Sequence, residues 1–153
     1  MQNLMNSVNE LLYVIIFTGL VAVFYSYLLS KQILKASPGN AKMQEIAAAI
    51  QIGAKAYLKR QYITISIVGV VVLAIVSYFF SPLVGLGYLI GATLSGIAGY
   101  LGMLISVEAN VRTAEASRKS LQSGLTMAFK SGAITGLLVA GLALLAISIY
   151  YLI

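Results

Sequence analysis

The sequence contains no cysteine, histidine, aspartate or tryptophan. Without cysteine it can form neither a disulfide framework nor a thiolate nucleophile. Without histidine it lacks imidazole acid–base catalysis and the usual nitrogen ligand of zinc. Metal chemistry could use only its four glutamates, which are the only acidic side chains. These absences exclude most common catalytic sites, and the sequence offers no catalytic, cofactor-binding or metal-binding residue.

Charged residues are also scarce. They make up 9% of the 153 residues, whereas 60% are hydrophobic, and the mean hydropathy is +0.95. A soluble domain of this length could not bury so much apolar surface, so the composition indicates a membrane protein in contact with lipid. The net charge of +6 could attract nucleic acid, but the cations accompany apolar runs rather than an aromatic-rich soluble face. We expect no nucleic-acid partner.

All ten lysines and arginines lie in two segments, residues 31–60 and 112–130. The apolar runs around them are long enough to cross a hydrocarbon core about 30 Å thick. We expect one transmembrane region, residues 1–153, with four helical spans at about 11–29, 62–80, 83–107 and 125–151. The positive-inside rule places the connectors, about 31–60 and 108–124, in the cytoplasm and both termini outside. The predicted protein is an all-α, multi-pass protein of the cell membrane.

The first connector is predicted to break at residues 37–40 and then to start a helix capped by Asn40. This helix is amphipathic and continues without a breaker into the second span. Its apolar stripe could bind anionic lipid or pack on neighbouring helix ends. We favour packing, because alanine and glycine flank the stripe. The stripe comprises Met43, Ile46, Ile50 and Tyr57.

The second connector is predicted to extend the third span as a helix, with a break near residues 120–124. Its charges are three and four residues apart, which suits ion pairs along one helix face. Glu108, Arg112 and Glu115 could instead form a charged site, but we interpret them as an ion-paired helix extension. Glu10 lies before the first span and is interpreted as a solvated residue of the outer surface.

Small residues recur every four positions in the third and fourth spans. This spacing lets a neighbouring helix approach to backbone contact, which is how helices pack in lipid. The third span is therefore predicted to be enclosed by neighbours. The two sets are Gly91, Ser95 and Gly99, and Gly132, Gly136 and Ala140.

Three segments resemble the membrane-bound, ion-pumping pyrophosphatases. Residues 43–46 (MQEI) and 50–62 (IQIGAKAYLKRQY) are similar to the entry to that family's second helix. Residues 95–103 (SGIAGYLGM) and 109–114 (ANVRTA) resemble its third helix, and this is the most specific match. Residues 128–133 (AFKSGA) and 136–142 (GLLVAGL) resemble its fourth. Gly99, Gly102, Asn110 and Arg112 fall in these motifs, and we assign them structural roles.

The resemblance implies an N-terminal outer-ring fragment of a larger multi-helix pump. Such pumps couple hydrolysis of magnesium pyrophosphate to outward transport of protons or sodium ions, and they work as homodimers. The family's Mg²⁺ and substrate sites are aspartate-rich stretches on later helices. Because this chain has no aspartate, the segment alone is expected to be inactive and to pack against the remaining helices of the pump.

Two other hypotheses remain open. One is a complete four-helix exporter that works as a dimer, although its only candidate coupling acid is Glu10. The other is a noncatalytic membrane assembly subunit, which predicts stable co-purification with a larger partner.

Overall fold

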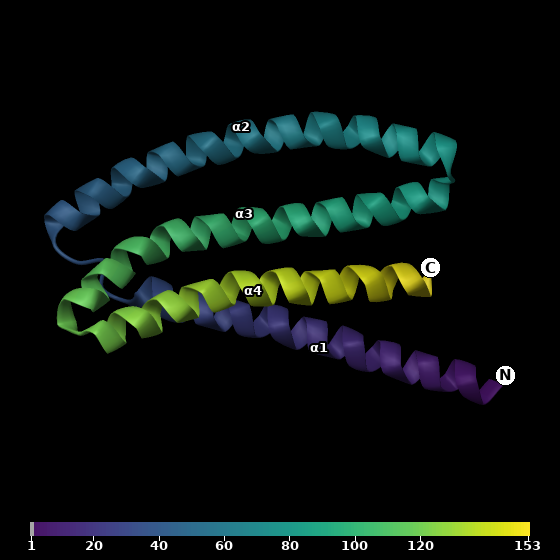
Figure 1. Cartoon of the computed structure of the whole chain (residues 1–153), viewed down its shortest axis with the longest axis horizontal. Helices are drawn as coiled ribbons and strands as arrows, with labels where there is room; N and C mark the ends of the chain where they lie inside the picture. The colour runs from purple at the N-terminus through teal and green to yellow at the C-terminus, as the bar shows by residue number, and fades with distance from the viewer. Residues whose placement is uncertain (1) are drawn as a thin grey trace.

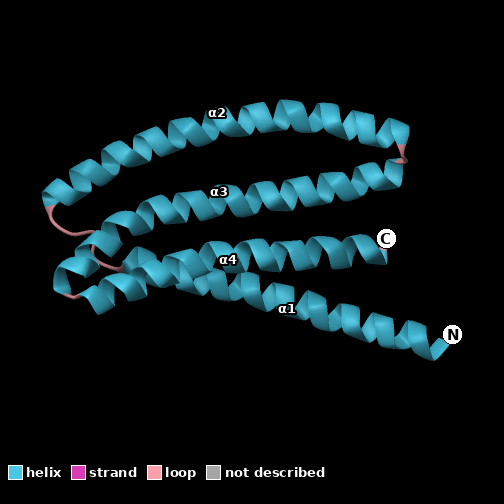
Figure 2. Ribbon diagram, viewed as in Figure 1, coloured by secondary structure: helices cyan, strands magenta, loops and turns pink. Residues whose placement is uncertain are grey.

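The computed structural model describes residues 2–153, with side-chain positions from residue 9 onward, so Met1 of the expected 1–153 region lies outside the described residues. Four helices follow one another: α1 (Gln2–Lys35), α2 (Ala41–Phe79), α3 (Pro82–Lys119) and α4 (Leu121–Leu152). Each is long and apolar enough to cross a membrane. The described residues contain no strand (Figure 2). The predicted all-α membrane fold is confirmed.

The helices are longer than a bilayer requires. The 39 residues of α2 and the 38 of α3 would each extend for about 57 Å at 1.5 Å per residue. A hydrocarbon core is only about 30 Å thick. Both helices must therefore project well beyond it, as the sequence pattern predicts for the basic connectors.

Short polar caps set the helix boundaries. Asn40 Oδ1 accepts a hydrogen bond from Met43 N at 3.0 Å, and the preceding Gly39 has a left-handed φ of +82° that suits glycine. Ser81 caps α3 by accepting from Val84 N at 3.2 Å, and Pro82 begins the helix. The predicted break at residues 37–40 and the turn between the second and third spans are confirmed.

The break between α3 and α4 is short. Only Ser120 interrupts the helices, and α4 is already helical from Leu121, so the predicted break near residues 120–124 is confirmed and is one residue long. Ser120 Oγ caps α4 by accepting from Ser123 N at 3.1 Å. Gly124 is buried with its Cα facing Ser117, so the first turn of α4 packs directly on the end of α3.

The four helices lie side by side in the order α2, α3, α4, α1 (Figure 1). α3 packs between α2 and α4, while α1 packs on α4 and touches α3 only slightly. Within residues 2–153, α1 and α2 make no contact. The chain therefore forms an open layer with α1 and α2 at its two edges, rather than a closed four-helix bundle.

The buried apolar core lies in the α1, α3 and α4 part of this layer. The most apolar 18-residue window of α2 contains no buried residue, whereas a third of the corresponding window of α4 is buried. α2 is thus the least enclosed helix among those described. The core cluster consists of Leu29, Ile33, Ala98, Ala109, Ile134 and Leu138.

Candidate functional site

Arg112 links α3 to the end of α1. Its Nη1 donates to Glu108 O at 2.6 Å and to Glu108 Oε2 at 2.9 Å, and its Nη2 donates to Leu34 O at 3.3 Å. Leu34 lies in the last turn of α1, where carbonyls have no partner within the helix and carry the negative end of the helix dipole. The Arg112 side chain is only 12% exposed. Its guanidinium therefore donates hydrogen bonds to a free carbonyl at the end of α1 and to a carboxylate at the same time.

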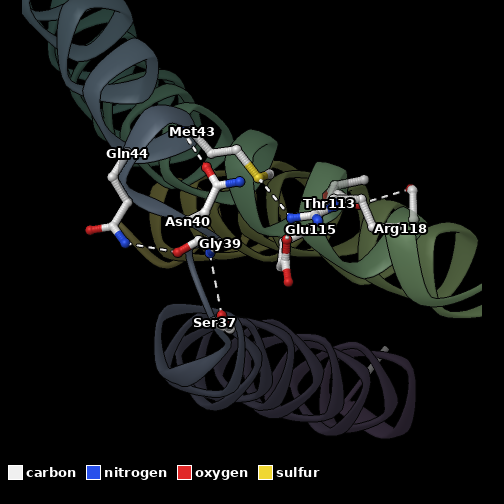
Figure 3. A network of polar contacts seen from close by, with 9 residues as sticks. Ser37, Gly39, Asn40, Met43, Gln44, Thr113, Glu115 and Arg118 are labelled. Atoms are coloured by element: carbon white, nitrogen blue, oxygen red, sulfur yellow. Dashed lines mark hydrogen bonds and ion pairs between the residues drawn. The ribbon is translucent and has the colours of Figure 1, made fainter.

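A second polar cluster orders the connector between α1 and α2 (Figure 3). Arg118 Nη1 pairs with Glu115 Oε2 at 3.0 Å and lies 3.8 Å from Met43 Sδ on α2. In the same connector, Gln44 Nε2 donates to Gly39 O at 2.8 Å. Of these contacts, only the one between Arg118 and Met43 joins α3 to the start of α2.

The charges of this region are paired along the helix rather than gathered into a site. Glu108 pairs with Arg112, and Glu115 pairs with Arg118. From residue 9 onward, no group of three or more potential metal ligands occurs. The side chains here do not make a site for the Mg²⁺ that the resemblance implies, and we derive no catalytic step from them.

Two of the glycines that match the family motif lie at helix contacts. A Cβ on Gly102 would lie 3.0 Å from Thr135 Cγ2 on α4, and a Cβ on Gly99 would lie 3.1 Å from Tyr62 Oη on α2. α3 therefore presents glycine to each neighbour. Asn110 is exposed, and it lines a hollow of about 290 Å³ between α2 and α3.

The apolar stripe of the first connector lines the same hollow. Met43, Ile46 and Ile50 face residues 107–114 of α3 across it, and both isoleucines remain 52% exposed. The residues of α2 that are buried are Ala47 and Leu58. The apolar stripe thus lies along the edge of the contact between α2 and α3. The buried residues Ala47 and Leu58, which are not part of the stripe, lie at the centre of that contact.

The four-residue spacing of small residues in α4 did not identify its close contact with α1. Cβ atoms on Gly132 and Gly136 would meet nothing within 4 Å, whereas one on Gly141 would lie 2.9 Å from Gly19 O on α1. A Cβ on Gly91 of α3 would likewise meet nothing within 4 Å. The buried face of α4 is offset from the predicted one and comprises Gly124, Ile134, Leu138, Gly141, Leu145 and Ser148.

Sequence reasoning also missed the polar contact between α2 and α3. Tyr62 Oη donates to Gly96 O at 2.6 Å, and the Tyr62 ring meets Tyr100 edge to face with centroids 5.3 Å apart. A tyrosine at the basic end of a span would ordinarily suggest an interfacial anchor. Only the pairing of the two helices shows that this hydroxyl has a backbone partner.

The sequence profile of the family described as "Inorganic H+ pyrophosphatase" matches residues 20–153, most of the chain. The chain belongs to this family. Of its relatives, a K⁺-insensitive pyrophosphate-energized proton pump of Methanosarcina mazei is 45% identical, and the match covers 88% of this chain and 20% of the relative. The chain spans about one-fifth of the length of such pyrophosphatase-family relatives.

Other relatives with comparable matches are named as pumps of either ion. A putative K⁺-stimulated pyrophosphate-energized sodium pump of Bacteroides thetaiotaomicron is 44% identical over 88% of this chain and 19% of its own length. A K⁺-insensitive proton pump of Chloroflexus aurantiacus is 36% identical over 95% of this chain and 22% of its own. Similarity to this part of the family does not distinguish the two ions.

Proposed function

We propose that this chain forms part of the outer wall of a pump that couples pyrophosphate hydrolysis to transport of H⁺ or Na⁺ across the cell membrane. The family match over residues 20–153 carries this proposal. The open layer of helices supports it, because its exposed faces offer apolar surface to lipid and to further helices of the pump.

The proposed role is structural. Ion relays need ionisable side chains that lie within the spans and face the interior of the helix bundle. The four glutamates all lie outside the expected spans. We place the Mg²⁺-pyrophosphate site and the ion pathway on other helices of the pump. The family resemblance implies that the pump works as a homodimer. The layer would support those helices, and Arg112 would hold its basic end together.

Hydrolysis and assembly measured together test this role. The gene is expressed in full and membranes are prepared from the cells. In these membranes, Arg112→Gln should lower the amount of assembled pump. Pyrophosphate hydrolysis per assembled pump should stay unchanged. The matched control is Arg118→Gln, because the Arg118 side chain is 59% exposed and its ion pair contributes little. Normal assembly with hydrolysis lost would place Arg112 in the chemistry and contradict the structural role.

The proposed orientation places the basic connectors in the cytoplasm and the α2–α3 turn outside. The sequence lacks cysteine, so single cysteines can be introduced without background. We expect a membrane-impermeant maleimide to label Phe80→Cys in intact cells, and to label Ser37→Cys and Gln122→Cys only after the cells are permeabilised. All three positions are exposed. The reverse pattern would contradict the orientation.

A further inference from the structure

An open groove of about 480 Å³ runs between α2 and α3. Small residues, among them Ser66, Gly69, Ala92 and Gly96, leave space between the two helices, and Tyr62 lies at one end of the groove. The rest of the lining is mostly larger and apolar, with three hydroxyl-bearing side chains: Ile65, Val70, Leu73, Leu89 and Ile97, and Tyr88, Thr93 and Tyr100. The groove is therefore a long apolar slot with few polar groups.

The length of this groove matches one leaflet of a bilayer. On α2 it extends from Tyr62 to Leu73, which is about 17 Å at 1.5 Å per residue. One leaflet contributes about half of the roughly 30 Å hydrocarbon core. A transmembrane helix would need a groove about twice as long, so the dimensions favour an acyl chain over a helix.

Cations lie directly beyond one end of the groove. Lys59 and Lys55 are three and seven residues before Tyr62, and so lie on the same side of α2 as the groove. Both lysines are exposed, and neither forms an ion pair with the side chains described from residue 9 onward. The nearest acid is Glu108, which lines a smaller hollow with Lys55 but already pairs with Arg112.

From this geometry we propose that the α2–α3 groove is a binding site for an anionic phospholipid. One acyl chain lies in the slot between Tyr62 and Leu73, and the phosphate binds Lys59, with Lys55 completing the cationic end. A cation close to the surface of an anionic leaflet attracts its lipids. In the proposed orientation the site opens to the cytoplasmic leaflet.

Native mass spectrometry of the protein as encoded by its gene tests the site. The protein is equilibrated in equal amounts of phosphatidylglycerol and phosphatidylcholine, and the lipid that survives detergent removal is counted. We expect phosphatidylglycerol to be enriched. Lys55→Gln with Lys59→Gln should lower that enrichment by about fivefold per removed charge. Equal retention of the two lipids by the unaltered protein would overturn the proposal.

Arg60 offers a matched control for charge. It is also exposed and unpaired within the part of the chain whose side chains are described, but it is rotated about 100° from Lys59 around the helix. Arg60→Gln should change the enrichment less than twofold. If Arg60→Gln lowered the phosphatidylglycerol enrichment as much as Lys59→Gln, the attraction would come from the whole basic segment. The proposal of a specific site would then be wrong.

A second pair of variants tests the apolar part of the groove. Gly69→Leu fills the slot, and it should be tolerated because a Cβ there would lie 3.7 Å from its nearest contact, Tyr88 Oη. It should abolish the retained phosphatidylglycerol, whereas Val68→Leu, on the neighbouring face, should not. Unchanged retention in Gly69→Leu, or a helix of the pump seated in the groove in an experimental structure, would overturn the proposal. Bound lipid is counted independently of pumping, so either result leaves the proposed function separately testable.

Discussion

The interface between α1 and α4 and the interface between α2 and α3 pack in different ways. In the first, Gly19 and Gly141 face each other, so that a Cβ on either would lie within 3.0 Å of the other's carbonyl oxygen. In the second, Tyr62 Oη donates a hydrogen bond to Gly96 O across the contact, and a groove of about 480 Å³ lies beside it. The first interface is closed at the backbone between Gly19 and Gly141, whereas the second is open along the groove.

The difference shows what glycine contributes to packing in lipid. Lipid is as apolar as the side chains, so close contact and hydrogen bonds must drive helix association. Gly141 allows backbone contact because another glycine opposes it. Gly69, which has only Tyr88 Oη within 4 Å of its Cβ position, instead leaves empty space. Glycine therefore allows backbone contact at Gly141, where the partner helix presents a small residue, but not at Gly69, where it does not.

Adding one methyl group at Gly141 should produce the largest change. The new Cβ would lie 2.9 Å from Gly19 O, and backbone cannot move aside as a side chain end can. We expect Gly141→Ala to lower the free energy of unfolding by about 1–3 kcal/mol, as overpacking does. Heating the purified protein in detergent and measuring the fraction that remains monodisperse checks this.

Gly136→Ala is the control, because a Cβ at Gly136 would meet nothing within 4 Å. Alanine has a helix propensity about 1 kcal/mol better than glycine, so this variant should be unchanged or slightly more stable. Equal losses in the two variants would mean that the α1–α4 contact is not the closely packed interface described above.

Arg112 should come next in size. Arg112→Gln leaves Leu34 O and the Glu108 carboxylate without their donor, and we expect a loss of about 1–2 kcal/mol. Arg112→Lys should recover little, because an ammonium cannot reproduce the planar fork of the guanidinium. Hydrogen exchange should rise at the last turn of α1 and remain unchanged at the α2–α3 turn. Full recovery by lysine would show that charge alone matters there.

The sequence was sufficient to predict the four helices, the break at residues 37–40 and the turn between the second and third spans. Apolar run length predicted four helices, and the cap at Asn40 was predictable because its side chain bonds locally and does not depend on tertiary structure. The faces that meet could not be predicted in the same way. In a membrane protein, both lipid-facing and buried positions are apolar, so hydropathy does not separate Gly136, which is open, from Gly141, which is closed.

The candidate site was predictable only in part. The spacing of Glu108 and Arg112 predicted their ion pair, which is local to one helix. The contact from Arg112 to Leu34 O joins residues 78 positions apart, and no periodicity within α3 indicates it. The lipid groove depends on the relative rotation of two helices, which the sequence alone does not specify.

The hydroxyl of Tyr62 should have the smallest effect of the three interface variants. Tyr62→Phe removes the 2.6 Å hydrogen bond to Gly96 O but keeps the ring that meets Tyr100 edge to face. Hydrogen bonds between membrane helices contribute about 0.6 kcal/mol on average, so the thermal midpoint should fall only slightly. Tyr150→Phe loses a longer hydrogen bond of 3.2 Å to Leu83 O, so its thermal midpoint should fall less still. A loss in Tyr62→Phe as large as that in Gly141→Ala would reverse the comparison, because a single polar contact would then hold α2 to the layer as firmly as glycine packing holds α1.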